Sequence, residues 1–295
     1  MWHQVSLTTT EVSADYYSDL LSELGALSIS LEDEGDQPIF EPKPGETPIW
    51  HNTRVIALFE AETDLAAIKA ELDAPMVEHR YGSWRVEALE DQAWERAWLE
   101  HFRPMSFGQR LWILPTGFER PDEADAVCVQ LDPGLAFGTG THPTTALCLQ
   151  WLDGQPLQGK SVIDFGCGSG ILGIAALLLG AERCVAVDID PQALTATADN
   201  AQKNGVAHCI QTCLPQGMPE GQYDIVLANI LANPLIELAG KLADLVKPGG
   251  RIALSGILRE QAEQVLLAYL PYFEMDAPVF QDDWCRLSGA LAPGR

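Results

Sequence analysis

The first ninety residues combine strand-like and helix-like patterns of apolar positions. Alternation of apolar and polar residues predicts four strands, at residues 2–9, 26–31, 54–60 and 83–89. Helical spacing predicts two helices, at 13–25 and 64–72, the first with Ser13 as its N-cap and Gly25 at its end. The order βαββαβ is that of a ferredoxin-like α+β domain, which we assign to residues 1–90. Because it contains no constellation of reactive residues, we interpret it as a recognition module.

The spacing of aromatic residues within 91–103 predicts a helix that links two domains. Trp94, Trp98 and Phe102 recur at every fourth position, which places three rings on one helical face. An aromatic stripe of this kind is typical of packing against a neighbouring domain, and a binding role is the alternative.

The rest of the chain, residues 104–295, alternates strands with helices. Two short strands are expected at 111–115 and 126–130. The next seven strands are expected at 162–164, 184–187, 210–214, 224–228, 251–255, 278–281 and 285–290, the last two as an antiparallel pair. Predicted helices separate most of them, at 145–152, 171–179, 192–204, 235–246 and 261–270. This pattern predicts an α/β fold with a seven-stranded doubly wound sheet and a ligand crevice at the carboxyl ends of its early strands.

A glycine cluster follows the first strand of this sheet, in the segment Asp164-Phe-Gly-Cys-Gly-Ser-Gly170. Its glycines also fit the G-x-G-x-x-G spacing of dinucleotide-binding turns, with Asp188 about 20 residues further on. A dinucleotide would place its pyrophosphate beside Asp164, which would repel it. S-adenosylmethionine instead offers an ammonium group to Asp164 and a ribose to Asp188. The pattern from Asp164 through Gly166 and Gly168 therefore favours S-adenosylmethionine, and a glycine turn without a ligand is the alternative.

Two further segments are expected at the same crevice. Asn229 ends another predicted strand, so it should converge with Asp164 and Asp188 at one edge of the sheet. Residues 131–145 form a glycine-rich stretch that also holds Phe137, His142 and paired threonines. We interpret this stretch as a ligand-covering loop; the alternative is a plain connector whose threonine hydroxyls only cap the next helix.

Charge narrows the class of partner. The chain of 295 residues carries a formal net charge of −24, and residues 1–100 hold 21 acidic against 6 basic side chains. Such a surface repels a phosphate backbone, which argues against a nucleic-acid substrate, and it attracts a basic protein. Simple solubility is the alternative explanation of the charge.

Cysteine usage and hydropathy indicate a cytoplasmic protein. The seven cysteines are odd in number and do not form a disulfide framework, and no signal peptide or transmembrane run is evident. His208, Cys209 and Cys213 lack the spacing of a metal site, so no metal is expected. The sequence leaves the oligomeric state open, and a monomer is the working assumption.

The motifs together resemble class I methyltransferases and, more narrowly, the PrmA family of methyltransferases. The broad likeness rests on Asp164–Gly170 and on Val187-Asp-Ile-Asp-Pro191. The narrow one rests on Leu131-Asp-Pro-Gly-Leu-Ala-Phe-Gly-Thr-Gly-Thr-His-Pro-Thr-Thr145 and Asn229-Ile-Leu-Ala232. With the first module, the likeness covers nearly the whole chain.

The resemblance implies an N-terminal substrate-recognition domain, a linker at 91–103 and a catalytic domain at 104–295. It implies repeated methylation of lysine ε-amines and of the N-terminal α-amine of ribosomal protein L11, a basic protein. It also places Thr145, Gly166, Asp188 and Asn229 at the S-adenosylmethionine site, beside Asp164 and Gly168.

The residues do not identify a catalytic group. Asn229 is a candidate for positioning the amine, through its side chain or its backbone carbonyl. Ile230 and Leu231 after it offer no aromatic clamp for a base or planar amide, which agrees with a lysine substrate. His142 is the candidate for a general base. An NAD-dependent oxidoreductase and a non-catalytic protein that binds S-adenosylmethionine remain as the alternative functions.

Overall fold

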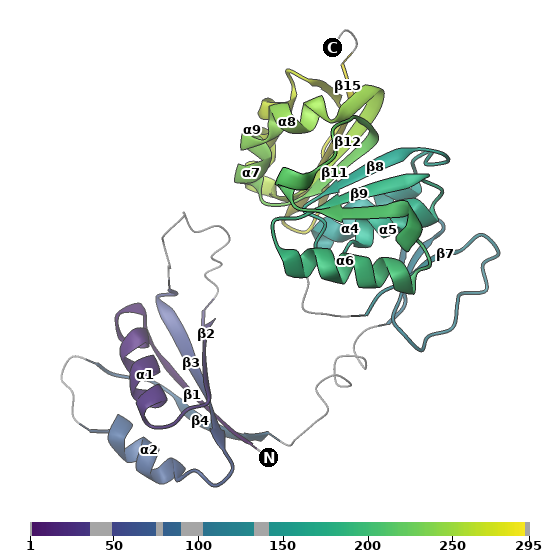
Figure 1. The fold of residues 1–295 in the computed structure, drawn as a ribbon. Helices are drawn as coiled ribbons and strands as arrows, with labels where there is room; N and C mark the ends of the chain where they lie inside the picture. The colour runs from purple at the N-terminus through teal and green to yellow at the C-terminus, as the bar shows by residue number, and fades with distance from the viewer. Residues whose placement is uncertain (1, 36–48, 75–78, 90–102, 133–141, 293–295) are drawn as a thin grey trace. The chain divides into compact units, whose positions relative to one another are not determined.

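The structure is a computed structural model that describes residues 2–35, 49–74, 79–89, 103–132 and 142–292. The chain divides into two compact units, Met1–Trp94 and Glu95–Arg295 (Figure 1). The predicted linker helix at 91–103, apart from Arg103, and residues 133–141 of the predicted covering loop lie outside the described residues. Among the described residues, no helix is long and apolar enough to cross a membrane.

The N-terminal unit has the predicted ferredoxin-like arrangement. Its elements are β1 (Trp2–Thr10), α1 (Glu11–Glu23), β2 (Ser28–Asp33), β3 (Asn52–Glu60), α2 (Leu65–Leu72) and β4 (Trp84–Leu89). The strands form one antiparallel sheet in the order β2-β3-β1-β4. Both helices cover the same face of this sheet, as Figure 1 shows, and the core between them contains Val5, Tyr17, Phe59 and Ile68.

The start of α1 differs from the prediction. The helix begins at Glu11 directly after β1, with Thr10 at the N-cap position and no side-chain cap. Ser13 therefore lies inside the helix, and the prediction of an N-cap there is wrong. Its hydroxyl instead pairs with Nδ1 of His79 at 3.0 Å. The second helix has a side-chain cap, because the Asp64 carboxylate accepts from two backbone amides of its first turn.

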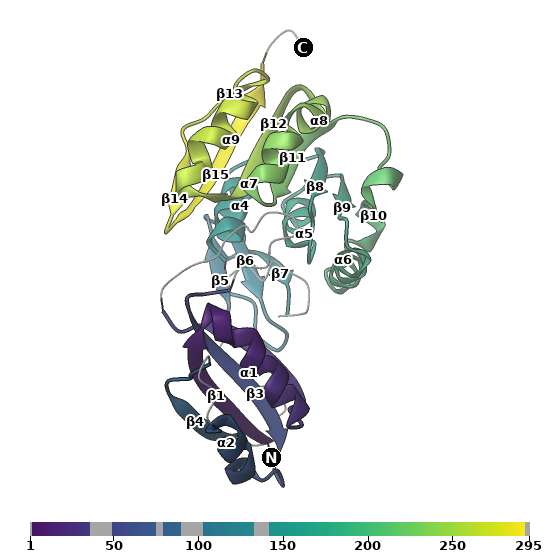
Figure 2. The same ribbon diagram turned by 90° about the vertical axis from the view of Figure 1, so that its left-hand side faces the viewer.

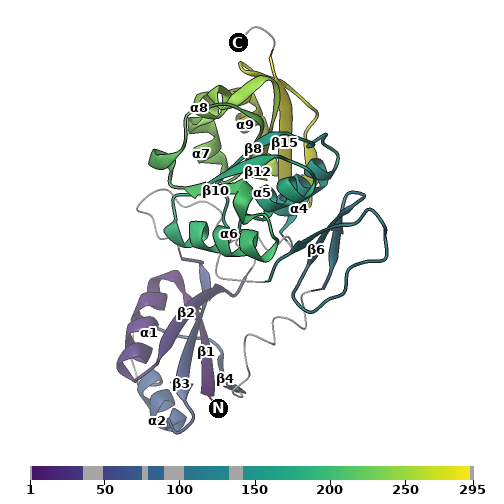
Figure 3. The same cartoon turned by 45° about the vertical axis from the view of Figure 1, so that its right-hand side comes forward.

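The second unit begins with a small three-stranded sheet (Figure 3). It consists of β5 (Met105–Phe107), β6 (Leu111–Leu114) and β7 (Val127–Gln130), in that order. The last two strands were predicted. Apolar residues of this sheet, among them Phe107, Ile113 and Val129, belong to the same core as the helices that cover one face of the large sheet.

The large sheet follows the order β10-β9-β8-β11-β12-β15-β13, and β14 pairs with β15 outside this path. Its strands are β8 (Ser161–Phe165), β9 (Arg183–Val187), β10 (Ile210–Cys213), β11 (Tyr223–Asn229), β12 (Val246–Leu258), β13 (Phe273–Met275), β14 (Val279–Gln281) and β15 (Trp284–Leu291). The five strands from β10 to β12 are parallel, and the others join antiparallel. All seven predicted strands are present, and β13 is an eighth strand that was not predicted; β13 takes the edge position beside β15, while the predicted β14 pairs with β15 outside the main path.

Helices cover both faces of this sheet and bury two separate cores. One face packs against α4 (Pro143–Asp153), α5 (Ile171–Leu178) and α6 (Pro191–Lys203). The other packs against α7 (Ala232–Glu237), α8 (Ala239–Asp244) and α9 (Ala262–Tyr269), seen in Figure 2 beside β11 and β12. The helix predicted at 235–246 is in fact the pair α7 and α8, which meet at Leu238.

Candidate active site

Three predicted site residues lie at one edge of the large sheet. In the parallel register, Phe165 at the end of β8 pairs with Val187 of β9 and with Ala228 of β11. The residues that follow these positions are Gly166, Asp188 and Asn229. The chain leaves β8 for β9 on one side and returns as β11 on the other, so this edge is the point where the strand order reverses. Open parallel sheets bind ligands at such a point.

The glycine turn after β8 is held in a conformation that other residues rarely adopt. Gly166, Gly168 and Gly170 have φ values of +79°, +53° and +78°. A Cβ atom at Gly166 would lie 2.2 Å from Cγ2 of Ile230, which leaves no room for a side chain. The glycines therefore allow the turn itself and also a close approach of the Asn229–Ile230 segment.

The Asp188 carboxylate stabilises this turn by accepting hydrogen bonds from backbone amides. Its Oδ2 accepts a hydrogen bond of 2.9 Å from the backbone amide of Gly168, and its Oδ1 accepts one of 3.0 Å from the amide of Asp190. Each carboxylate oxygen has two lone pairs, so both can accept a further hydrogen bond. The ribose hydroxyls of a nucleoside are donors of the kind that this carboxylate suits.

Asp164 is a buried carboxyl group that is only half satisfied. It is 1% exposed, and its Oδ2 accepts a hydrogen bond of 2.9 Å from the backbone amide of Gly173. Within the part of the chain that the structure describes, its buried Oδ1 has no partner. Burial raises the pKa of Asp164 to about 7, the hydrogen bond from Gly173 opposes this rise, and the negative charge of Asp188 adds to it. A buried, unpartnered carboxylate oxygen fits the binding of an ammonium group, which would supply both a donor and a positive charge.

Thr145 joins the site from α4. It is fully buried in the first turn of that helix, and its hydroxyl accepts a hydrogen bond of 3.3 Å from Nδ2 of Asn229. This contact brings together two segments that lie far apart in the sequence. With Nδ2 directed at Thr145, the amide oxygen of Asn229 is left as an acceptor.

His142 has a structural role at the start of α4. It is the N-cap residue, and its Nδ1 lies 3.3 Å from the backbone nitrogen of Thr144 and 2.8 Å from the Thr144 hydroxyl. Its ring packs edge-on against Trp284, with the centroids 4.7 Å apart, and burial lowers its pKa. The cap is therefore His142, and neither of the threonines that follow it. A neutral ring that accepts through Nδ1 carries its proton on Nε2, so this arrangement disfavours His142 as a general base.

Ile230 is a residue of the site that the sequence analysis did not single out for a role. Its side chain fills the space beside Gly166, and its carbonyl oxygen would lie 2.2 Å from a Cβ atom at Gly256 of β12, which has φ +83°. Ile230 thus lies between two glycines, with its side chain against Gly166 and its carbonyl against Gly256. Gly256, directly after the strand predicted at 251–255, is the signal that could have revealed this close approach. Beyond it, the side chain of Leu231 is 49% exposed.

Comparisons with known proteins place this arrangement in a family. Residues 1–291 match the family model described as "Ribosomal protein L11 methyltransferase (PrmA)". A protein of that name from Methylococcus capsulatus is 59% identical over 290 residues, which cover 98% of this chain and 99% of the relative. Proteins of the same name from Klebsiella pneumoniae and Pseudomonas aeruginosa are each 55% identical, with 98% of both chains covered.

A solved structure agrees with these relatives. The crystal structure of ribosomal protein L11 methylase from Lactobacillus delbrueckii subsp. bulgaricus is 32% identical and has a TM-score of 0.58. The match covers 63% of this chain and 97% of that one. The chain belongs to the family of ribosomal protein L11 methyltransferases.

Proposed function

We propose that this chain transfers methyl groups from S-adenosylmethionine to lysine ε-amines and to the N-terminal α-amine of ribosomal protein L11. Family membership makes the chain a protein methyltransferase that uses this methyl donor. It also favours this activity over an NAD-dependent oxidoreductase and over a protein that only binds the donor. The observation that carries the choice of ligand is the buried Oδ1 of Asp164, which has no partner among the described residues and fits an ammonium group.

Each predicted site residue has a role that its position supports. Asp164 would pair with the ammonium group of the donor, and Asp188 would accept hydrogen bonds from its ribose. The turn with Gly166 and Gly168 would let the backbone lie against the ligand, because both glycines have a positive φ and a side chain at Gly166 would collide with Ile230. When bound, S-adenosylmethionine supplies a methyl group attached to a positively charged sulfur.

The contribution of this chain to the reaction is to hold the amine of the substrate in its neutral form. A lysine with a pKa of about 10.4 costs about 4.6 kcal/mol to deprotonate at pH 7, and an α-amine with a pKa of about 7.8 costs about 1 kcal/mol. Enclosure of the amine lowers this pKa, because an apolar surrounding disfavours the charged form. Asn229 offers two acceptors for the amine hydrogens, its backbone carbonyl and the side-chain oxygen whose orientation Thr145 fixes. We propose that this positioning, without a dedicated strong base, accounts for most of the rate.

The acidic surface supports a basic protein as the substrate. The net charge of −24 attracts such a partner and repels nucleic acid. We infer that the N-terminal unit binds the protein substrate, that nucleic acid is not methylated, and that the enzyme works as a cytoplasmic monomer. Size-exclusion chromatography with light scattering tests the oligomeric state directly.

One experiment tests the proposed function. The chain is incubated with radiolabelled S-adenosylmethionine and ribosomal proteins from cells that lack this enzyme, and the proteins are separated. We expect label in the L11 band, located by mass spectrometry on lysines and on the N-terminus. Asp164→Asn, which keeps the size of the side chain but removes the charge, serves as the matched variant with weakened donor binding. Label on ribosomal RNA, or donor binding without any labelled protein, would contradict the proposal.

A further inference from the structure

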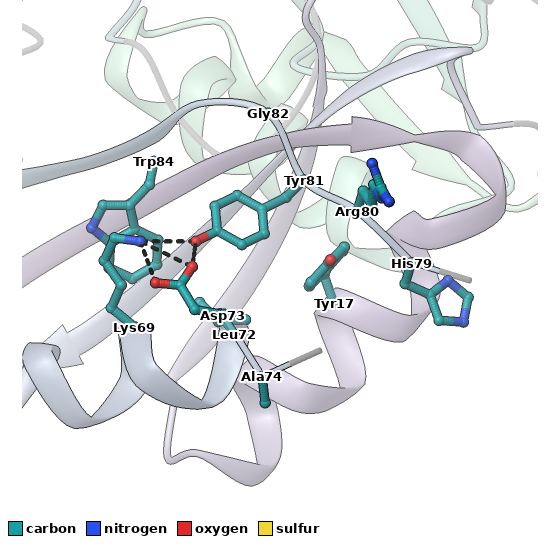
Figure 4. A pocket seen from close by; sticks show the side chains of 10 residues that line it. All are labelled: Tyr17, Lys69, Leu72, Asp73, Ala74, His79, Arg80, Tyr81, Gly82 and Trp84. Atoms are coloured by element: carbon teal, nitrogen blue, oxygen red, sulfur yellow. Dashed lines mark hydrogen bonds and ion pairs between the residues drawn. The ribbon is translucent and has the colours of Figure 1, made fainter. Parts of the chain in front are cut away.

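The N-terminal unit contains a pocket whose wall already holds a positively charged group. The pocket has a volume of about 550 Å³ and lies between α1, α2 and the segment that leads into β4 (Figure 4). The charged group is the ammonium of Lys69, on α2. It lies among Asp73, Tyr81 and Trp84, which all line the same pocket.

All three hydrogens of the Lys69 ammonium have hydrogen-bond acceptors close by. Nζ of Lys69 lies 3.0 Å and 2.8 Å from the two carboxylate oxygens of Asp73 and 2.9 Å from the hydroxyl of Tyr81. The Tyr81 hydroxyl in turn donates to Asp73. The three N–H groups of the Lys69 ammonium thus face three acceptor atoms, which is the largest number of hydrogen bonds that an ammonium group can donate.

The indole ring of Trp84 is the third group around Nζ of Lys69. Together with Asp73 and Tyr81 it forms what we call the cage. Nζ of Lys69 lies 5.9 Å from the ring centre of Trp84, within the range of a cation–π contact. The distance to the ring centre of Tyr81 is 5.6 Å, but Nζ approaches that ring at its hydroxyl end, so this contact is a hydrogen bond rather than a contact with the ring face. A carboxylate, a hydroxyl and an indole face are together the groups that recognise an alkylammonium ion.

The aromatic residues of the cage are held in place by the core, whereas the ammonium of Lys69 is bound only weakly in it. Tyr81 and Trp84 pack against the core of the unit, and the ring of Tyr81 meets the buried ring of Tyr17 edge-on at 5.7 Å. The side chains of Lys69 and Asp73, by contrast, are 41% and 52% exposed and form a pair one helical turn apart. Exposed pairs of this kind add little stability, and a lysine stem is flexible, so another ammonium can replace that of Lys69 at small cost.

We propose that this pocket binds a lysine side chain of the basic protein substrate, whose ammonium displaces that of Lys69 from the cage. The identity of the partner rests on the proposed function. The charge of the unit favours such a ligand, since residues 1–94 hold 19 acidic against 5 basic side chains. An anionic ligand would be repelled by the carboxylate of Asp73. The lining residues of the pocket include none of the proposed donor-site residues, so we assign it to docking and not to methyl transfer.

The first test measures binding of a lysine analogue to the full chain. Nα-acetyl-lysinamide is titrated into ¹⁵N-labelled protein while the indole N–H resonance of Trp84, assigned with Trp84→Phe, is followed. We expect Lys69→Met to bind the analogue more tightly than the parent chain, because the internal competitor is gone. If Lys69 occupies the cage about nine-tenths of the time, the gain is about tenfold. Asp73→Asn should abolish the shift, and Nα-acetyl-norleucinamide, which lacks the ammonium, should cause none.

A matched control separates the cage from overall charge. Arg85→Met also removes one positive charge from this unit, but Arg85 does not line the pocket. It should leave the affinity for the analogue unchanged. Equal affinities for the parent, Lys69→Met and Arg85→Met would overturn the proposal, provided that each variant keeps the dispersed spectrum of a folded chain. If Lys69→Met is unfolded, Lys69→Gln takes its place.

The second test links the pocket to the substrate. In methyl-transfer assays with ribosomal protein L11, we expect Asp73→Asn and Tyr81→Phe to raise KM about three- to tenfold with kcat unchanged, as expected for the loss of uniform binding. An unchanged KM in both variants would overturn docking of the substrate at this pocket. The titration needs neither methyl donor nor turnover. A failure of the proposed activity is therefore distinguishable from a failure of this inference.

Discussion

The side-chain amide of Asn229, at the end of β11, donates a hydrogen bond of 3.3 Å to the hydroxyl of Thr145, in the first turn of α4. Thr145 is fully buried, so this hydroxyl has no access to water in place of its partner. The contact fixes which end of the Asn229 amide is free to accept a hydrogen from a substrate amine. It therefore ties the orientation of a proposed site residue to a helix on one face of the sheet.

We predict that Thr145→Val lowers methyl transfer about tenfold. The valine has nearly the same shape but leaves the amide of Asn229 without its acceptor, a loss of about 1–2 kcal/mol. Thr145→Ser keeps the hydroxyl and is the matched control, with activity near that of the parent chain. The measurement is kcat/KM for methyl transfer to L11. Equal activity of the valine and serine variants would show that the contact does not matter for the reaction.

Gly166→Ala should destabilise the chain and weaken donor binding. The added Cβ would meet Cγ2 of Ile230 at 2.2 Å, and the residue has a positive φ that alanine avoids. A cost of about 1–3 kcal/mol is expected from overpacking. Ile230→Ala should relieve part of it, so the double variant should be more stable than the sum of the two single effects. Thermal unfolding of the four proteins measures this coupling, and strict additivity would contradict the contact.

Asp164 should make the affinity for the methyl donor depend on pH. Its pKa is raised to about 7, so the carboxyl is increasingly neutral below that pH and pairs poorly with an ammonium group. We expect donor affinity to rise between about pH 6 and pH 8, as measured by calorimetry. In Asp164→Asn the affinity should be lower throughout, and this rise should disappear.

The same group gives a prediction for stability. A carboxyl whose pKa is higher in the folded than in the unfolded chain stabilises the fold while it is protonated. Its contribution is full below the unfolded pKa of about 3.9 and is lost as pH rises towards about 7. Without the donor, Asp164→Asn should therefore unfold at a higher temperature than the parent chain at pH 8. The difference should shrink as the pH is lowered to 5.

His142 should be replaceable by another helix cap. If it serves as the N-cap of α4, His142→Asn keeps a capping side chain and nearly full activity, whereas His142→Ala loses about 1 kcal/mol of stability. The pH profile of kcat should have the same shape in the parent and the asparagine variant. A profile that loses its acidic limb in His142→Asn would instead reveal a general base.

The sequence was informative where a pattern is local. The strand order of the first unit follows from alternation and helical spacing, and the placement of Asp188 and Asn229 follows from their positions directly after apolar runs. Parallel strands bring such positions to one edge whatever the details of packing. The assignment of these residues to S-adenosylmethionine stays a prediction.

Features that depend on distant contacts were not predictable in this way. Strand β13, Phe273–Met275, is too short to show a period, and its existence depends on pairing with β15. The cap of α1 was misplaced, because β1 runs directly into the helix and leaves Ser13 inside it. Lys69 and Asp73 are one turn apart in the sequence, but only the fold brings Tyr81 to them.

The passage of Ile230 between Gly166 and Gly256 has a consequence for attempts to change the substrate. Beside Asn229, the carbonyl of Ile230 lies against Gly256 and its side chain lies against Gly166, so a side chain cannot be added at either glycine without moving this segment. The first position where chemistry can be varied freely is Leu231, whose side chain is half exposed. Libraries aimed at new acceptors should therefore begin at Leu231 and leave the two glycines unchanged.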